Sequence, residues 1–142
     1  MGVPIDDLGE PEPLPQVLQL RVAITTSDYE RLVRFYTVGL GIEPADFWDN
    51  GQGRGLILTM GTATLEIFDV AQATTVDAIE AGERVSGPIR FALQVPDLAA
   101  AIDRLLANGA TLVHPPVITP WGDRNVRLQD PDGMQITPFQ VQ

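Results

Sequence analysis

The sequence predicts an α+β fold built from two βαβββ modules whose mixed sheets curve around a central cup. Two observations support this: residues 17–41 have a strand-like and then a helical pattern, and residues 89–109 repeat that order. A repeated order of elements indicates duplication better than any single segment does. Each module alone would leave its helix and one sheet face poorly covered. We therefore expect the modules to pair, with their other strand faces lining a shared concavity.

The first module begins with a strand in which apolar and polar residues alternate. Apolar side chains occupy every second position from Val17 to Thr25, which is typical of a strand with one buried face. Ser27 and Glu30 form a capping-box pair that predicts the start of a helix, and Gly39 and Gly41 predict its end. Three shorter strands are expected after it, at Pro44–Asp49, Gly55–Met60 and Thr64–Asp69.

The second module repeats these elements after a connector with a short helical stretch at Val76–Ala81. A strand is predicted from Ile89 to Val95, and Asp97 caps a helix that ends at Asn108-Gly109. The remaining strand candidates are Thr111–His114, Val117–Thr119, Asn125–Gln129 and Met134–Phe139. When the copies are aligned, Arg21 corresponds to Arg90, Asp28 to Asp97, and Leu65–Phe68 to Ile136–Phe139.

The length of the chain predicts one domain. Its 142 residues match the usual size of a single core. We place the domain at residues 17–142, with modules at 17–70 and 89–140 and a connector at 71–88. Residues 1–16 are rich in proline and acidic residues, which predicts an extended or disordered arm.

The charge of the chain limits its partners. Nineteen acidic residues against nine basic ones give a formal net charge of −10. This charge disfavours binding to nucleic acid or to an anionic membrane surface. No apolar run approaches the ~20 residues that span a bilayer, and the first residues lack the pattern of a signal peptide. Because cysteine is absent, disulfides and thiolate ligands are excluded. We expect a cytoplasmic protein whose partner is a small molecule.

Five motifs occur in an order that resembles a known superfamily. They are SDYE at residues 27–30, RFYTVGLG at 34–41, VPDL at 95–98, PWGDR at 120–124 and DPDGM at 130–134. Together they resemble the vicinal oxygen chelate superfamily, which includes glyoxalase I, extradiol dioxygenases and bleomycin-resistance proteins. The resemblance covers nearly the whole predicted body and implies the same two-module cup. It is less specific for an activity, because one fold hosts several chemistries.

The resemblance also implies where a divalent metal would be held, on the cup-facing sides of four strands. On this chain the four positions are Arg21, Glu66, Arg90 and Thr137. Only Glu66 has the chemistry of a metal ligand, because an arginine has no lone pair to donate and a threonine hydroxyl is a weak ligand. The single histidine, His114, precedes two prolines at a strand end, away from these positions. We therefore expect no divalent metal and no other cofactor.

The group Arg21, Glu66 and Arg90 has two interpretations. It is a structural ion-pair network that fills the former metal position, because a buried arginine needs a counter-charge. Alternatively, two cations against one anion leave a charge of +1 in the cup, which suits a carboxylate or another oxyanion on a ligand. Both interpretations can hold together.

Four aromatic side chains are expected to form the apolar part of the pocket. By strand alternation, Phe68 and Phe139 share the face of Glu66 and Thr137, whereas Trp48 lies on an outer strand and Trp121 on a loop at the rim. Ordinary core packing is the alternative for each ring. The candidate ligand-binding residues are Arg21, Trp48, Glu66, Phe68, Arg90, Trp121, Thr137 and Phe139.

The preferred function is a metal-free protein that sequesters a small molecule in the cup, as the resemblance to bleomycin-resistance proteins implies. An alternative is a glyoxalase- or dioxygenase-like enzyme (a lyase, isomerase or oxygenase) with an atypical metal set or none. A structural or regulatory module is the third possibility. No catalytic residue is assigned. We expect a homodimer, because a two-module cup leaves sheet edges and apolar faces that a second copy can cover. Pairing of the modules within one chain or between two chains stays open.

Overall fold

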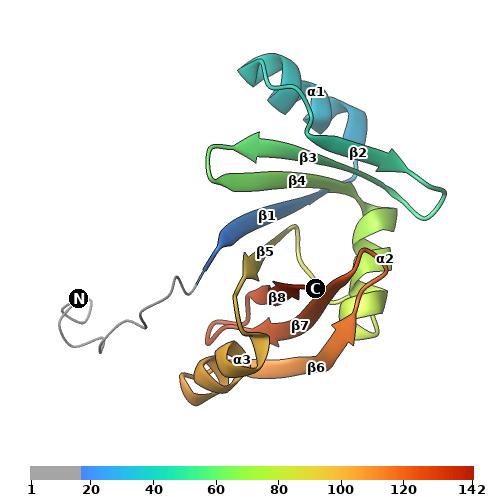
Figure 1. Cartoon of the computed structure of the whole chain (residues 1–142). Coiled ribbons are helices and arrows are strands. Elements are labelled where there is room, and N and C mark those ends of the chain that lie inside the picture. Colours follow the sequence, from blue (N-terminus) through green and yellow to red (C-terminus); the bar gives the residue numbers. More distant parts are fainter. Residues whose placement is uncertain (1–16) are drawn as a thin grey trace.

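The structure is a computed structural model that describes residues 17–142, so the predicted arm at 1–16 lies outside it. The first module comprises β1 (Gln19–Thr26), α1 (Tyr29–Leu40), β2 (Asp46–Asp49), β3 (Arg54–Met60) and β4 (Ala63–Asp69). After α2 (Val70–Ala81), the second module comprises β5 (Ile89–Gln94), α3 (Leu98–Ala107), β6 (Thr111–Ile118), β7 (Asp123–Gln129) and β8 (Gln135–Val141). The eight strands form one open mixed sheet in the order β2-β3-β4-β1-β5-β8-β7-β6 (Figure 1). The predicted α+β fold of two βαβββ modules is confirmed.

The two modules join within one chain through β1 and β5, which pair antiparallel. Val22 lies opposite Phe91, Arg21 lies opposite Ala92, and Ala23 lies opposite Arg90. Arg21 corresponds to Arg90 and Ala23 to Ala92, so each of these β1 residues lies opposite the counterpart of the other on β5. Inside each module the first strand pairs in parallel with the last, β1 with β4 and β5 with β8. The pairing supports the predicted duplication and places the last strands of both modules on either side of the junction.

The helix caps agree with prediction except at one residue. The cap of α1 is Asp28, whose side chain accepts a hydrogen bond from the Arg31 backbone nitrogen at 3.4 Å, so the predicted Ser27–Glu30 capping box is wrong. Aspartate and serine are similarly good caps, and the chain begins its helix one residue later. Gly41 ends α1 with a φ of 67°, and Asp97 caps α3 as predicted.

Helices α1 and α3 cover the outer face of the sheet, one on each module. On the second module the buried core contains Val95, Leu98, Ala101, Val126, Leu128 and Ile136. On the first module Leu56, Leu58, Leu65 and Ile67 form the buried core, against which α1 places Tyr29, Leu32, Val33 and Tyr36. The apolar residues of the alternating strands thus point to the two helices, which leaves the other face for the cup.

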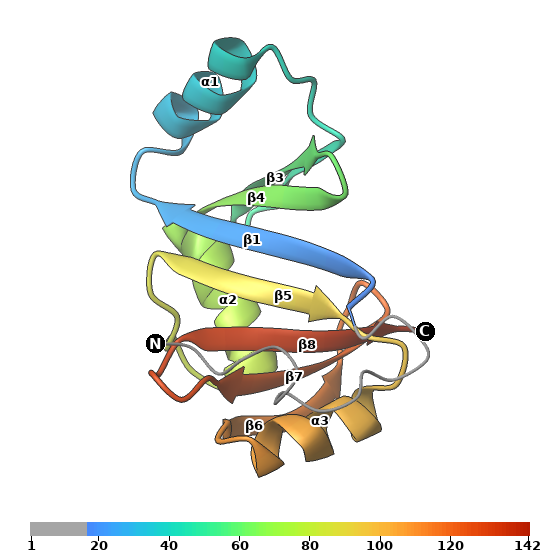
Figure 2. The same ribbon diagram turned by 90° about the vertical axis from the view of Figure 1, so that its left-hand side faces the viewer.

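Helix α2 is longer than predicted and lies on the opposite face of the sheet from α1 and α3 (Figures 1 and 2). It begins at Val70 because Asp69 caps it, accepting from the Gln72 backbone nitrogen at 2.8 Å, and it ends before Gly82 with a φ of 81°. The sequence predicted only residues 76–81 as helical. Because α2 buries Gln72, Asp77 and Glu80 along with apolar residues, its apolar periodicity is weak.

Strands β6 and β7 also differ from prediction. The two expected segments at 111–114 and 117–119 form one strand, β6, which continues through Pro115 and Pro116 with shifts in register. An edge strand tolerates prolines because one side needs no ladder hydrogen bonds. Strand β7 begins at Asp123, two residues earlier than predicted, and this brings Asp123 into the sheet. Within residues 17–142, no helix is long and apolar enough to cross a membrane.

Candidate functional site

A cavity of about 570 Å³ lies on the concave side of the sheet, next to α2. Both modules and α2 contribute to its walls, so the cavity exists only because the modules pair. All eight side chains predicted as ligand-binding line it, namely Arg21, Trp48, Glu66, Phe68, Arg90, Trp121, Thr137 and Phe139. Their placement together agrees with the sequence analysis, and their role in binding stays a prediction.

The apolar wall of the cavity depends on Trp48 and Phe68. Their rings meet edge to face, with centroids 6.1 Å apart and an interplanar angle of 63°. The indole lies directly over Gly55 of the neighbouring strand, where an added Cβ would come within 2.0 Å of Trp48 Cζ2. Phe47, one residue earlier, is exposed on the other face. Trp121 is half-exposed, which fits the predicted position at the rim.

Arg21 is held in a defined orientation on the cavity wall. Its guanidinium lies 4.5 Å from the centre of the Phe139 ring, and Arg21 Nε donates to Gln19 Oε1 at 2.8 Å. A cation over an aromatic face is stabilised by the ring's quadrupole. Within the described part of the chain, no carboxylate forms an ion pair with Arg21. Its outer nitrogens therefore remain available to a ligand or water.

Glu66 and Asp123 are acids on the cavity wall whose side chains form no hydrogen bond or ion pair with any residue of 17–142. Burial raises the pKa of Glu66, and the charges of Arg90 and then Arg21 oppose the rise. Burial likewise raises the pKa of Asp123, opposed by Arg21. The predicted ion-pair network of Arg21, Glu66 and Arg90 is therefore wrong as a set of direct contacts. The three side chains line the same cavity without forming an ion pair with one another.

Arg90 is instead part of a different buried cluster. Arg90 is 8% exposed, and its Nη1 donates to Thr137 Oγ1 at 2.8 Å. Burial lowers the pKa of Arg90, and the charge of Glu80, on α2, is the largest influence that opposes this. Glu80, rather than Glu66, is thus its main counter-charge.

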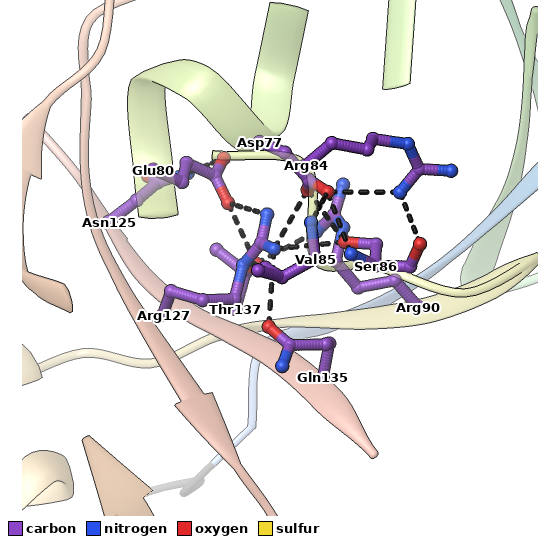
Figure 3. Close-up of polar contacts among 10 residues, drawn as sticks. All are labelled: Asp77, Glu80, Arg84, Val85, Ser86, Arg90, Asn125, Arg127, Gln135 and Thr137. Atoms are coloured by element: carbon purple, nitrogen blue, oxygen red, sulfur yellow. Dashed lines mark hydrogen bonds and ion pairs between the residues drawn. The ribbon is translucent and has the colours of Figure 1, made fainter. Parts of the chain in front are cut away.

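The centre of that cluster is Arg127, which the sequence analysis did not single out (Figure 3). Arg127 Nη1 donates to Asp77 Oδ1 and Arg127 Nη2 donates to Glu80 Oε1, each at 2.8 Å, and all three side chains are at most 2% exposed. Thr137 Oγ1 donates to Glu80 Oε1 at 2.9 Å, and Asn125 Nδ2 donates to Glu80 Oε2 at 2.9 Å. These contacts fix α2 against β7 and β8.

Asp77 extends the cluster to the segment that follows α2. It accepts hydrogen bonds from Ser86 Oγ at 2.6 Å, from the Ser86 nitrogen at 2.7 Å and from the Val85 nitrogen at 2.9 Å. Arg84 Nη1 donates to it at 3.0 Å from the solvent side. Hydrogen bonds from Ser86 and Arg127 overcome the effect of burial and hold the pKa of Asp77 far below its usual range.

A sequence signal for this cluster exists. Asp77 and Glu80 are three apart within residues 76–81, whose other members are apolar, so both lie on one face of a helix. Asp123, Asn125 and Arg127 alternate along β7, so they share the cup-facing side. Acids on a connector helix and a cation on a facing strand predict a buried pair, but only once the helix is known to lie in the cup.

The sequence matches one family over most of its length. The Glyoxalase/Bleomycin resistance protein/Dioxygenase superfamily matches residues 18–137. The chain belongs to this superfamily. Among curated proteins, no sequence matches the chain significantly.

Solved structures of the superfamily fold superpose on this chain at low sequence identity. A hypothetical protein, BH1468, from Bacillus halodurans C-125 is 15% identical with a TM-score of 0.64, over 86% of this chain and 92% of its own. A glyoxalase/bleomycin resistance protein/dioxygenase superfamily member from Vibrio splendidus 12B01 is 14% identical with a TM-score of 0.59, over 85% and 97%. Methylmalonyl-CoA epimerase from Mycobacterium tuberculosis is 18% identical with a TM-score of 0.58, over 89% and 88%. These likenesses establish the shared fold.

The positions that correspond to the superfamily's metal ligands do not suit a metal in this chain. Two of the four are guanidinium groups, which cannot coordinate a cation. The hydroxyl of Thr137 is already engaged by Arg90, Arg127 and Glu80. No cluster of three or more acidic or histidine side chains that could hold a metal ion is present in residues 17–142. His114 lies on β6 outside the cavity wall, with its Nδ1 at 2.7 Å from the Pro115 oxygen.

Proposed function

We propose that this chain binds a small organic molecule in the cup and that binding needs no divalent metal. The cavity that carries this proposal is of the size range used by small-molecule sites, and it combines aromatic walls with a few polar groups. Trp48, with Phe68 against it, offers apolar contact, and Arg21 and Glu66 offer charged groups that have no ion-pair partner in residues 17–142. The arrangement supports sequestration of a ligand with an apolar body.

Fluorescence of the two tryptophans tests binding, because both Trp48 and Trp121 line the cavity and no other tryptophan is present. A screen of small aryl compounds should include members that change the emission and raise the melting temperature. In Trp121→Phe, the remaining signal reports on Trp48 alone. Ala92→Leu, which adds volume to the cavity wall, should weaken each hit at least tenfold, whereas Ala99→Leu on the exposed face of α3 should not. The absence of any hit that Ala92→Leu weakens would contradict the proposal.

The metal-free part of the proposal follows from the donor chemistry. We expect the protein purified from cells supplied with Zn, Ni, Mn and Fe to contain far less than one divalent ion per chain, as measured by elemental analysis. One ion per chain that is lost in Glu66→Ala would contradict this part. Binding of aryl compounds would then have to be measured again with the metal in place.

A second candidate function is a metal-free enzyme that uses Glu66 as an acid–base group. One observation favours it: Glu66 is an unpaired carboxyl in a cavity, and burial raises its pKa, so it holds a proton more readily than a free glutamate does. The neighbouring structures of the same fold include methylmalonyl-CoA epimerases. Exchange of a bound ligand's C–H proton with deuterated water, abolished by Glu66→Gln at unchanged affinity, would support the enzyme. Binding without exchange supports sequestration.

A further inference from the structure

We infer that the ligand carries one positive charge, an ammonium or amidinium group beside an apolar body, and that Glu66 and Asp123 receive this charge. The inference rests on the proposed function and names the ligand class for the same cup. Three observations carry it: the charge balance of the cavity wall, the unpaired acids, and the orientation of Arg21.

The buried cluster below the cavity is balanced in charge. Arg90 and Arg127 face Asp77 and Glu80, so two cations meet two anions in direct contact or close range. Arg84 also contacts Asp77, but its side chain is 31% exposed, and water screens its charge. Arg90 therefore leaves no surplus positive charge for a ligand.

Outside this cluster, the charged side chains on the wall that are not in the exposed class are Arg21, Glu66 and Asp123. One cation against two anions leaves a surplus of one negative charge when both acids are ionised. Asp46 also lines the cavity but is exposed at the rim. The surplus of +1 expected from the sequence counted Arg90 as free to contact the ligand and did not include Asp123. In the structure Arg90 belongs to the buried cluster, and Asp123 lines the cavity.

Unpaired hydrogen-bond acceptors on the wall indicate the same ligand chemistry. Asp123 is 8% exposed, and its carboxylate has no partner within residues 17–142. Glu66 is likewise unpaired. Both carboxylates line the cavity without a protein donor from residues 17–142, and an N–H donor on a ligand would satisfy them.

Arg21 offsets one of the two negative charges on the wall, so the wall suits a ligand with one positive charge rather than two. It influences the pKa of both Glu66 and Asp123 without forming an ion pair with either. Gln19 and the Phe139 ring hold the guanidinium in place, so it does not collapse onto one acid. Each carboxylate therefore keeps an open side for the ligand cation, and the apolar body lies against Trp48 and Phe68.

Three probes that differ in charge but share one phenyl group test the inference: 2-phenylethylamine, 2-phenylethanol and 3-phenylpropionate. Each is titrated into the full chain at neutral pH and followed by tryptophan emission. We expect the amine to bind at least tenfold more tightly than the other two, because a charge-assisted hydrogen bond is stronger than a neutral one. Glu66→Gln and Asp123→Asn should each weaken the amine about tenfold. The matched controls Glu83→Gln and Asp103→Asn, on exposed residues outside the cavity, should leave it within about twofold.

The other outcomes separate the two proposals. Equal binding of all three probes overturns the charge assignment and leaves the proposed cup binding in place. Preferred binding of the propionate, weakened by Arg21→Ala, overturns it in favour of an anionic ligand. Failure of all three probes to change the emission overturns the charge assignment, while the wider aryl screen still tests the proposed function. Melting curves of each variant show whether the fold is intact.

Discussion

At the scale of single residues, Arg127 holds the concave side together. It binds both Asp77 and Glu80 in a buried setting, so its removal leaves two buried carboxylates without their cation. We predict that Arg127→Met lowers the free energy of unfolding by about 3–5 kcal/mol. Arg124→Met, on the exposed side of the same strand, should change it by less than about 0.5 kcal/mol. Urea denaturation followed by circular dichroism measures both, and a loss below about 1 kcal/mol in Arg127→Met would contradict the account.

Glu66 should make stability depend on pH. Burial raises its pKa in the folded protein, against the charges of Arg90 and Arg21 and together with that of Glu80. A raised acid pKa favours folding while the group is protonated, and this advantage is lost as the pH rises through the folded pKa. Glu66→Gln removes the titration. We predict that the variant is more stable than the parent at neutral pH and that the difference disappears below the ordinary glutamate pKa of 4.5. Melting temperatures measured across pH test this, and a Glu66→Gln variant that is less stable at neutral pH would refute it.

Among single residues, those that line the cavity were easier to predict from the sequence than the net charge of its wall. Strand alternation was enough to place Glu66, Phe68, Thr137 and Phe139 on one face. Asp123 was missed because the predicted strand began at Asn125, so the alternation was not extended back to Asp123, which follows a glycine turn. Glu80 was missed because the position of the connector relative to the sheet is not encoded in a local pattern.

At the scale of elements, the contact between β2 and β3 shapes the aromatic wall. Gly55 leaves the space that the Trp48 indole occupies, since an added Cβ would lie 2.0 Å from Trp48 Cζ2. We predict that Gly55→Ala displaces the indole, lowers the stability by about 1–3 kcal/mol and weakens binding of any aryl ligand. Gly87→Ala is the control, because nothing lies within 4 Å of its added Cβ. An unchanged emission spectrum of Trp48 in Gly55→Ala would show that the indole does not move.

The elements were predictable to different degrees for a physical reason. Helices α1 and α3 each have one apolar face against the sheet, so periodicity and caps revealed them. Helix α2 has polar residues buried against the second module and apolar ones, such as Val76, buried near Phe68. Burial on more than one side removes the contrast on which periodicity depends. Only the caps Asp69 and Gly82 mark its ends.

At the scale of the whole molecule, the duplication was the most predictable feature, because Arg21 and Arg90 recur at the start of each copy and the register of β1 with β5 relates them. The two copies differ in how well their outer helices are covered. Helix α3 buries Leu98 and Ala101, whereas α1 leaves Phe35, Val38 and Leu40 more than half exposed. Helix α1 therefore has three large apolar side chains exposed, whereas α3 has one, Leu106.

Because α1 has more exposed apolar residues than α3, we place the interface of the predicted homodimer on α1. Phe35 and Val38 are three residues apart, so they are neighbours on the surface of α1. A contiguous exposed apolar patch commonly marks an interface, and two-fold dimers are the commonest oligomers. We predict a dimer mass in light scattering and a shift toward monomer in Val38→Glu. Leu112→Glu, an exposed apolar residue on the edge strand β6, is the control. A monomer mass over a wide range of concentrations would refute the prediction.

The central claim is that the cup binds a small molecule without a metal. Its most direct test is a titration of 2-phenylethylamine into the full chain, followed by tryptophan emission with and without EDTA. The account predicts saturable binding with the same dissociation constant in both conditions. Binding that is lost in EDTA and restored by Zn, Mn or Fe would contradict it.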